Sequence, residues 1–269
     1  MNTPGSAVGT RGETRIHETA LVDADAELGE GVDVGPWAFI GPGVRVGDGT
    51  VVGPRVLIER DTHVGEDCQL ANGAVLGTDP QDLKYQGEQS VLEIGDRTVV
   101  REFATLNRGT EASGRTVVGS DCLLMAYSHI AHDCEIGSHV VLANSVNMGG
   151  HVVIEDWAIV GGLTPIHQYV RIGAHAFVGG GSRVPQDIPP YCRAAGNPPK
   201  LYGLNSVGLE RRGFSDEVRR ALKEAYRVLF MGNEILSRAV DRAEAEVSGI
   251  PEVKHLLAFI RASERGVTT

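Results

Sequence analysis

Aliphatic residues recur at every sixth position along the first two thirds of the chain. From Ile16 to Val184 this position is almost always Val, Ile, Leu or Met, and a glycine often follows it directly. Only Asp82, Glu88 and Ala112 break the register. One aliphatic residue per six is typical of a parallel β-helix, in which three short strands make each triangular coil. We therefore expect a β-solenoid whose aliphatic side chains point into the prism and form a continuous core.

The three breaks fall in two segments, near residues 77–93 and 107–117, and the hexad register is the same before and after each of them. Because the hexad register is unchanged after each break, the broken segment is a loop that projects from the solenoid and not the end of the solenoid. Loops on a rigid scaffold are where binding and catalytic residues are commonly placed. We therefore expect two functional loops on one β-helix.

Helical patterning replaces the hexads after the proline-rich segment 197–199. Ser215 can cap a helix that stops near Gly232, and further helical segments follow around 235–247 and from 251 to about 263. The sequence thus predicts a disordered N-terminal extension over 1–12, a parallel β-helix over 13–192 and a small α-helical C-terminal domain over 193–269.

Composition and charge narrow the class of protein. The 35 glycines and the low aromatic content of 5% suit a turn-rich β structure. The first twelve residues lack the pattern of a secretory signal, and no stretch is apolar enough for a membrane span, so we expect a cytoplasmic protein. The net charge of −10 argues against nucleic acid as a partner, although residues 200–269 carry 12 basic residues against 10 acidic ones.

The four cysteines, Cys68, Cys122, Cys134 and Cys192, have no metal-ligand spacing. The first three take the same place in the repeat. Buried small side chains are therefore the expected role, and no metal is assigned to them.

Six of the nine histidines lie between His129 and His175, where the hexad repeat requires none. In a coil of 18 residues, positions 18 apart stack about 4.8 Å from one another, the spacing of neighbouring strands. The stacked columns are His132 with Gly150 and Gln168, Asp133 with His151 and Tyr169, His129 with Asn147, and His167 with Gly149.

A histidine below a glycine N–H, with an acid alongside, suits acyl transfer: a general base near neutral pH plus a donor for an oxyanion. The alternative is that outward histidines only decorate a solvated face. A second alternative is zinc, which the γ-class carbonic anhydrases hold on the same repeat with two histidines five residues apart. No two histidines here have that spacing, so no metal is expected.

Several motifs resemble the UDP-N-acetylglucosamine acyltransferase family of lipid A synthesis, in order and at the family's spacing. They are PQDLKY at 80–85, NRGT at 107–110, SHIAHDC at 128–134, GGH at 149–151, IHQY at 166–169 and LERRGFS at 209–215. The resemblance covers roughly residues 16–265. It implies a left-handed parallel β-helix and transfer of a (3R)-3-hydroxyacyl chain from acyl carrier protein to the sugar 3-hydroxyl, without a cofactor.

The resemblance also implies residue roles. His132 matches the family's general base, Asp133 would support its imidazolium, and the Gly150 N–H would hold the oxyanion. Positions that line the sugar-nucleotide and acyl groove match Asp82, Lys84, His129, His151, His167 and Gln168. Positions near the uridine diphosphate match Asn205, Arg211 and Arg212. The family often has an acidic residue two places after this asparagine, and here Val207 takes that place.

A residue late in the β-helix sets acyl length in the family, and its match is Gly180, which predicts a long chain. The family acts as a homotrimer with sites between neighbouring β-helices. A landing surface for the acidic acyl carrier protein is expected on Arg211, Arg212, Arg219, Arg220 and Lys223.

Other functions compete with this interpretation. One is a non-catalytic β-helix scaffold, and another is acylation of the 3-amino analogue of the sugar nucleotide. The sister N-acyltransferase has an additional N-terminal domain, whereas the hexads here start at Ile16. A third alternative is an enzyme that transfers a small acyl group from acetyl-CoA, and only the motif match argues against it.

Overall fold

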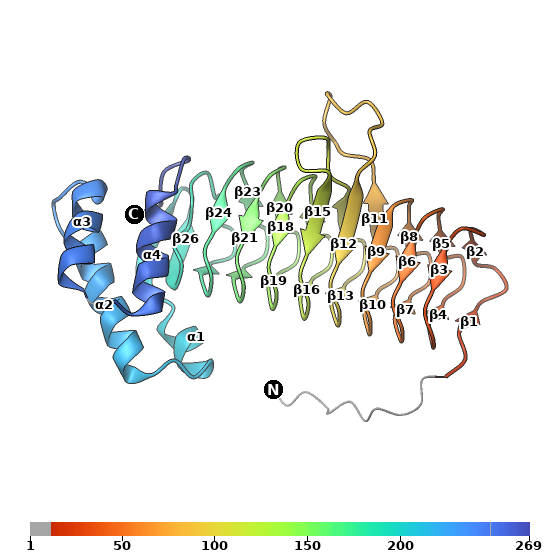
Figure 1. Cartoon of the computed structure of the whole chain (residues 1–269), viewed down its shortest axis with the longest axis horizontal. Helices are drawn as coiled ribbons and strands as arrows, with labels where there is room; N and C mark the ends of the chain where they lie inside the picture. Colours follow the sequence, from red (N-terminus) through yellow and green to blue (C-terminus); the bar gives the residue numbers. More distant parts are fainter. Residues whose placement is uncertain (1–11, 248) are drawn as a thin grey trace.

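The computed structural model describes residues 12–247 and 249–269, which form a long solenoid followed by a group of helices (Figure 1). Of the predicted extension 1–12, only Gly12 lies within the described residues. The solenoid is a left-handed parallel β-helix with three sheets, as expected. None of the helices in the described ranges is both long and apolar enough to cross a membrane.

The strands are mostly two residues long, and from β1 to β25 every third strand belongs to the same sheet. The first sheet contains β1 (Arg15–Ile16), β4 (Asp33–Val34), β7 (Val51–Val52), β10 (Gln69–Leu70), β13 (Val99–Val100), β16 (Leu123–Leu124), β19 (Val141–Leu142), β22 (Ile159–Val160), β25 (Phe177–Val178), β26 (Cys192–Gly196) and β27 (Pro199–Leu204). The second contains β2 (Leu21–Val22), β5 (Phe39–Ile40), β8 (Leu57–Ile58), β11 (Val75–Thr78), β14 (Thr105–Asn107), β17 (His129–Ile130), β20 (Asn147–Met148) and β23 (Pro165–Ile166). The third contains β3 (Glu27–Leu28), β6 (Arg45–Val46), β9 (Thr62–Val64), β12 (Val91–Ile94), β15 (Arg115–Val118), β18 (Glu135–Ile136), β21 (Val153–Ile154) and β24 (Arg171–Ile172).

The pairing register confirms the 18-residue coil. Asp33 pairs with Val51, and His129 pairs with Asn147. Across the first loop Gln69 pairs with Val99, 30 residues on, and across the second Val99 pairs with Leu123, 24 residues on. Each loop therefore adds a whole multiple of six, which is why the coil resumes in phase.

The predicted hexad residues form the core of the prism, and they are buried from Val34 to Val184. Ile16 is an exception at 49% exposed, because it lies on the open first coil. The structure adds a second inward position two residues earlier in each hexad. Small or hydroxyl side chains fill it, such as Ala74, Cys134 and Thr164. All four cysteines are free and buried, as predicted.

One position of the turn repeatedly takes a left-handed backbone conformation. Asp133, His151 and Tyr169 have φ values of 58°, 60° and 63°, a region that few non-glycine residues adopt. Because this conformation repeats from coil to coil, the three side chains project from the same corner one above another. The predicted column of these residues is thus a consequence of the turn.

The chain leaves the β-helix through a hairpin that the sequence did not predict. Strand β26 pairs in parallel with β25 and antiparallel with β27, so the hairpin spans the predicted domain boundary at 192–193. Four helices follow in the described part of the chain: α1 (Ser206–Arg211), α2 (Asp216–Phe230), α3 (Leu236–Glu246) and α4 (Pro251–Arg261). The last three match the predicted helical segments, and the Ser215 hydroxyl accepts a hydrogen bond from the Val218 N–H as the expected cap of α2.

Candidate active site

Both loops and the predicted histidine columns lie at one corner of the prism. Residues 79–90 join β11 to β12, and residues 108–114 join β14 to β15, so each loop connects the second sheet to the third. The turns 131–134, 149–152 and 167–170 make the same connection in later coils. The prediction of two loops is confirmed, and this second–third corner gathers the candidate chemistry.

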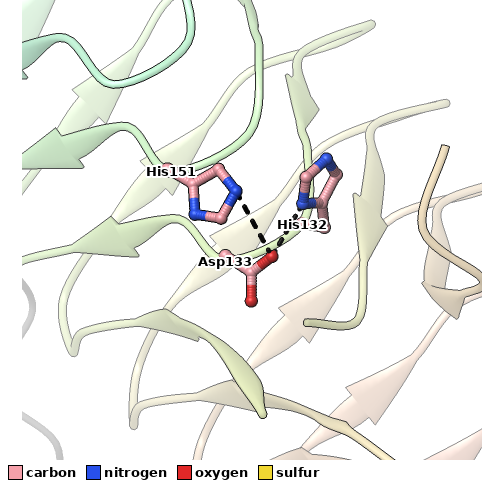
Figure 2. Close-up of side chains that lie close together, drawn as sticks. All are labelled: His132, Asp133 and His151. Atoms are coloured by element: carbon pink, nitrogen blue, oxygen red, sulfur yellow. Dashed lines mark hydrogen bonds and ion pairs between the residues drawn. The ribbon is translucent and has the colours of Figure 1, made fainter. Parts of the chain in front are cut away.

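His132 and Asp133 form a hydrogen-bonded pair (Figure 2). The His132 Nδ1 atom lies 2.7 Å from Asp133 Oδ2. His151, one coil on, places its Nε2 atom 3.8 Å from the same oxygen, and its ring meets that of His132 edge-on. Tyr169 stacks on the far side of the His151 ring at 4.5 Å. The pairing leaves Nε2 of His132 as the atom available to a substrate hydroxyl.

Residues of the second loop hold the carboxylate of Asp133. Its Oδ1 accepts from the Thr110 N–H at 3.0 Å and from the Ser113 hydroxyl, and its Oδ2 accepts from the Thr110 hydroxyl at 2.7 Å. Burial works to raise the pKa of Asp133, but the hydrogen bonds from Ser113, His132 and Thr110 outweigh it and lower the pKa to about 2. Asp133 is therefore ionised at neutral pH.

Gly150 lies directly against the His132 ring, as the 18-residue column predicts. A methyl group on Gly150 would come within 2.4 Å of His132 Cε1. No hydrogen bond from the Gly150 N–H to any described residue occurs, so this donor is free for an oxyanion. The geometry thus supplies a base and an oxyanion donor side by side.

The remaining predicted groove residues surround this pair less closely. His129 Nδ1 lies 2.7 Å from the Thr105 hydroxyl, and burial, with a contribution from nearby His132, lowers the pKa of His129. Burial also lowers the pKa of His151, with Asp133 opposing it. Asp82 lies close enough to His151 to favour its charged form.

Three further predicted residues expose their side chains at the same corner. Lys84 donates its backbone N–H to Asp82 Oδ1 at 3.0 Å, and its side chain is exposed. His167 and Gln168 lie on the exposed turn after β23. His167 Nδ1 lies 3.1 Å from the Gln168 carbonyl, and all three side chains are exposed enough to meet a ligand.

The predicted nucleotide residues lie at a different corner, where the third sheet meets the first. Asn205 caps α1 through Gly208 and donates its Nδ2 to the His175 carbonyl at 3.0 Å. Arg212 places Nη1 3.3 Å from His175 Nδ1 and its guanidinium over Trp157 at 5.1 Å. Burial and the positive charge of Arg212 lower the pKa of His175 to about 4.

A single chain therefore does not bring Arg212 together with His132. His175, which sequence reasoning did not single out, is the residue that organises this second group. It lies in the turn between β24 and β25, whereas His132 lies in the turn between β17 and β18. Gly180 occupies the third corner, in the turn that follows β25, and is exposed there.

A groove runs between the first sheet and helices α1 and α2. Tyr202, Val207 and Met231 give it exposed apolar surface. The basic side chains that line it are Arg193, Arg211, Arg219, Arg220, Lys223 and Arg227. Arg219 is paired with Asp216, and Arg211, Arg220 and Lys223 make no ion pair within the described residues. Four of the five residues predicted as a basic landing surface thus line this groove, and Arg212 does not.

The geometry of the pair also bears on metal binding. Histidine, cysteine, aspartate and glutamate are the side chains that could hold a metal ion. Within residues 12–247 and 249–269, one group of three such residues has all its ligand atoms within 4.8 Å of one another, namely His132, Asp133 and His151. Both oxygens of Asp133 already accept two hydrogen bonds each. A cation would have to replace these donors, so we assign no metal.

The parallel β-helix and its histidine corner define a hexapeptide-repeat transferase. Residues 43–78 and 115–150 match the family described as "Bacterial transferase hexapeptide (six repeats)". Residues 187–268 match the family described as "Udp N-acetylglucosamine O-acyltransferase; Domain 2".

Full-length relatives narrow this class to one enzyme family. The acyl-(acyl-carrier-protein)–UDP-N-acetylglucosamine O-acyltransferase of Myxococcus xanthus is 52% identical over 255 residues, which cover 94% of this chain and 99% of that protein. The protein of the same name from Chlorobaculum tepidum is 57% identical over 245 residues, covering 91% and 93%. The chain belongs to the UDP-N-acetylglucosamine O-acyltransferase family.

Solved structures agree in fold over nearly the whole chain. LpxA from Acinetobacter baumannii superposes with a TM-score of 0.92 at 39% identity and covers 94% of this chain and 99% of its own. LpxA from Bacteroides fragilis, described as a UDP-N-acetylglucosamine acyltransferase, also has a TM-score of 0.92 at 39% identity, with 95% and 100% covered.

Proposed function

We propose that this protein transfers a (3R)-3-hydroxyacyl chain from acyl carrier protein to the 3-hydroxyl of UDP-N-acetylglucosamine, the first step of lipid A biosynthesis. The observation that carries the proposal is the His132–Asp133 pair beneath the free N–H of Gly150. Its support is the nearly full-length similarity to proteins named for this reaction. That similarity also disfavours a non-catalytic scaffold.

The proposed chemistry needs only groups of the protein and the two substrates. His132 Nε2 takes the proton of the sugar 3-hydroxyl as that oxygen attacks the thioester carbonyl. The Nδ1–H of the imidazolium is held by Asp133, which stays ionised because its pKa is about 2. The Gly150 N–H stabilises the oxyanion, and when the intermediate collapses the leaving thiolate recovers the proton from His132.

Substrate contacts are assigned from position and charge. Asp82, Lys84, His151, His167 and Gln168 surround the pair at the second–third corner and would contact the sugar and the acyl chain. His129 lies beside them in β17. The nucleotide contacts would be Asn205, Arg211 and Arg212, since guanidinium groups pair well with diphosphate.

The separation of these two groups supports a homotrimer. His132 and Arg212 lie at different corners of the prism, so neighbouring chains packed side by side would complete one site from two subunits. The basic groove beside α2 would receive acyl carrier protein, whose acidic surface complements it. The proposal places this reaction in the cytoplasm.

The shared site can be tested by mixing subunits. His132→Ala and Arg212→Ala chains, each inactive alone, should regain about a quarter of wild-type activity when unfolded and reassembled together, because that share of random pairs is intact. No recovery in mixed assemblies would contradict the shared site.

The reaction is tested by acyl transfer from a 3-hydroxyacyl carrier protein to UDP-N-acetylglucosamine. Wild type should be active, and His132→Ala should lose on the order of 10² to 10⁴ in kcat while still binding the sugar nucleotide. Activity on the 3-amino analogue with none on the hydroxyl sugar would change the acceptor. No transfer to either acceptor would overturn the proposal.

A further inference from the structure

The tetrapeptide Asn107–Thr110 lies at the start of the second loop and contacts both halves of the site. Its sequence, NRGT, is one of the motifs of the family resemblance, yet the reaction proposed above assigns a role to none of its four residues. All four are buried, although they belong to a polar corner. Each residue makes a different contact, and together these contacts account for the motif.

Arg108 is the largest side chain that is fully buried. Its guanidinium donates to the Gly77 carbonyl and to Asp79 Oδ1, and Nη2 also lies 3.2 Å from the Tyr85 hydroxyl. Tyr85 in turn contacts Asp79 Oδ1 and the Glu88 carbonyl, both at 3.3 Å. A buried guanidinium is costly unless such partners are held in place, so Arg108 ties down the first loop near both ends.

Asn107 adds to the same anchor. Its Nδ2 donates to the Thr78 hydroxyl at 2.7 Å and to the Asp79 carbonyl at 3.0 Å. Asp82 and Lys84 lie between the two anchored points, Asp79 and Tyr85. The position of these proposed substrate contacts is therefore set by Asn107 and Arg108.

Gly109 and Thr110 turn toward the catalytic pair instead. A Cβ on Gly109 would come within 2.3 Å of the Arg115 backbone nitrogen, so only glycine allows the two loop ends to approach this closely. The approach places Thr110 on Asp133, to which it donates both its N–H and its hydroxyl. Ser113 supplies a further donor to the same carboxylate.

We propose that Asn107–Thr110 positions the two halves of the active site separately: Arg108 sets the loop of Asp82 and Lys84, and Thr110 sets the carboxylate of Asp133. The inference rests on the proposed function, because it takes the first loop as a substrate contact and Asp133 as the support of the base. Arg108 and Thr110 are positioning residues, and neither needs to touch a substrate.

The two residues should therefore affect different steps. Arg108→Lys keeps the charge but loses the forked geometry, so it should raise KM for UDP-N-acetylglucosamine about tenfold and leave kcat nearly unchanged. Thr110→Val should lower kcat about tenfold or more, as expected for a lost hydrogen bond to a charged group, and leave the Kd for the sugar nucleotide unchanged.

Thr110→Val should also change how the stability of the protein depends on pH. With one donor gone, burial raises the pKa of Asp133 above its present value, so the stability that its ionised carboxylate contributes should be lost at a higher pH than in the wild type. The charged groups that face Asp133 are His132 and His151, with Asp82 beyond His151, and all of them are retained in the variant. A loss of packing alone would lower the free energy of unfolding by a similar amount at every pH and would leave its pH dependence unchanged.

The experiment compares steady-state kinetics, calorimetric Kd for the sugar nucleotide and the pH dependence of urea unfolding. Thr98→Val is the control for Thr110→Val, because Thr98 is also buried but lies between the third and first sheets, where its hydroxyl donates to the Gly119 carbonyl. Arg97→Lys is the control for Arg108→Lys, since Arg97 forks onto Asp121 at a different corner, where the third sheet meets the first. Thr110→Ser, which keeps the hydroxyl, should restore kcat and the pH dependence of the stability.

Two milder variants serve if the buried substitutions fail to fold. Tyr85→Phe should reproduce the KM effect in part, and Ser113→Ala, at an exposed position, should reproduce the shift in the pH dependence of the stability. The inference would be overturned if Arg108→Lys and Thr110→Val both changed KM and kcat to the same extent, or if neither variant changed the kinetics. An inactive wild type would instead count against the proposed function.

Discussion

The Cα of Gly150 faces the imidazole of His132 so closely that an added methyl group would come within 2.4 Å of the ring. This contact fixes one side of the ring, and the hydrogen bond to Asp133 fixes its rotation. The position of the His132 ring thus depends on the missing side chain of Gly150 as well as on the carboxylate of Asp133.

Gly150→Ala should therefore displace the His132 ring and lower kcat by about 10² or more, comparable to losing the general base. Binding of UDP-N-acetylglucosamine should persist, which calorimetry would show. Gly232→Ala is a matched control, because its Cβ would lie 3.7 Å from the nearest atom and meets no catalytic residue. Unchanged kcat in Gly150→Ala would mean that the ring tolerates a new position.

Asp133 should make the stability of the protein depend on pH. Its pKa falls from an ordinary 3.8 to about 2 in the folded chain, so its contribution of roughly 2 kcal/mol is present above pH 3.8 and is lost as the pH falls toward 2. Urea unfolding of wild type and Asp133→Asn should differ most near pH 7 and converge near pH 2. A difference that stays constant with pH would contradict this assignment.

Gly180 offers a test of acyl length. It is exposed and its backbone is not left-handed. A Cβ would lie 3.2 Å from the Gly162 carbonyl oxygen and 3.5 Å from the Gly162 nitrogen, so a longer side chain fits with a small adjustment. Gly180→Met should shift preference toward shorter 3-hydroxyacyl chains, measured as the ratio of kcat/KM across a series of acyl carrier proteins. Gly180→Ala should shift it less. The same preference in all three proteins would remove Gly180 as the length determinant.

The basic groove beside α2 should make the reaction sensitive to salt. Raising ionic strength should lower kcat/KM for acyl carrier protein steeply, because exposed charges steer association. Arg220→Glu with Lys223→Glu should lower it further and flatten the salt dependence. Arg238→Glu is the control, since Arg238 is exposed on α3 and does not line the groove. Salt-insensitive kinetics would place the docking surface elsewhere.

Chelation should leave the reaction unchanged. Both oxygens of Asp133 are engaged by hydrogen-bond donors, and the proposed steps use only side chains, a backbone N–H and the substrates. Dialysis against EDTA should preserve kcat, and added Zn²⁺ should not raise it. Loss of activity on chelation with recovery on Zn²⁺ would show that His132, Asp133 and His151 hold a metal.

Much of this fold could be predicted because each hexad repeats the same physical requirement. The aliphatic position of the hexad predicted the prism, and the unbroken hexad register predicted the two loops. The 18-residue coil predicted that Gly150 lies on His132 and that His151 lies beside Asp133. These are consequences of period alone, so they need no knowledge of the loops.

Contacts made by the irregular segments could not be predicted in the same way. Thr110 and Ser113 reach Asp133 from a loop without a period, and nothing in their spacing indicates that contact. The burial of Arg108 contradicts what a lone arginine in a polar loop suggests. The hairpin of β26 and β27 and the role of His175 depend on how the chain leaves the last coil, which propensity does not determine.

The coil length of the β-helix imposes a rule on how such a chain can change in length. An insertion of six residues that the coil itself takes up moves every later side chain to the next corner, and an insertion of one such residue turns the core outward from that point on. Unless the added residues project as a loop, as residues 79–90 and 108–114 do, only a complete coil of 18 residues keeps all corners aligned, and it extends the molecule by about 4.8 Å. The spacing between the catalytic turn and the turn of Gly180 is thus quantised, so a binding groove that spans them can lengthen only in steps of one coil.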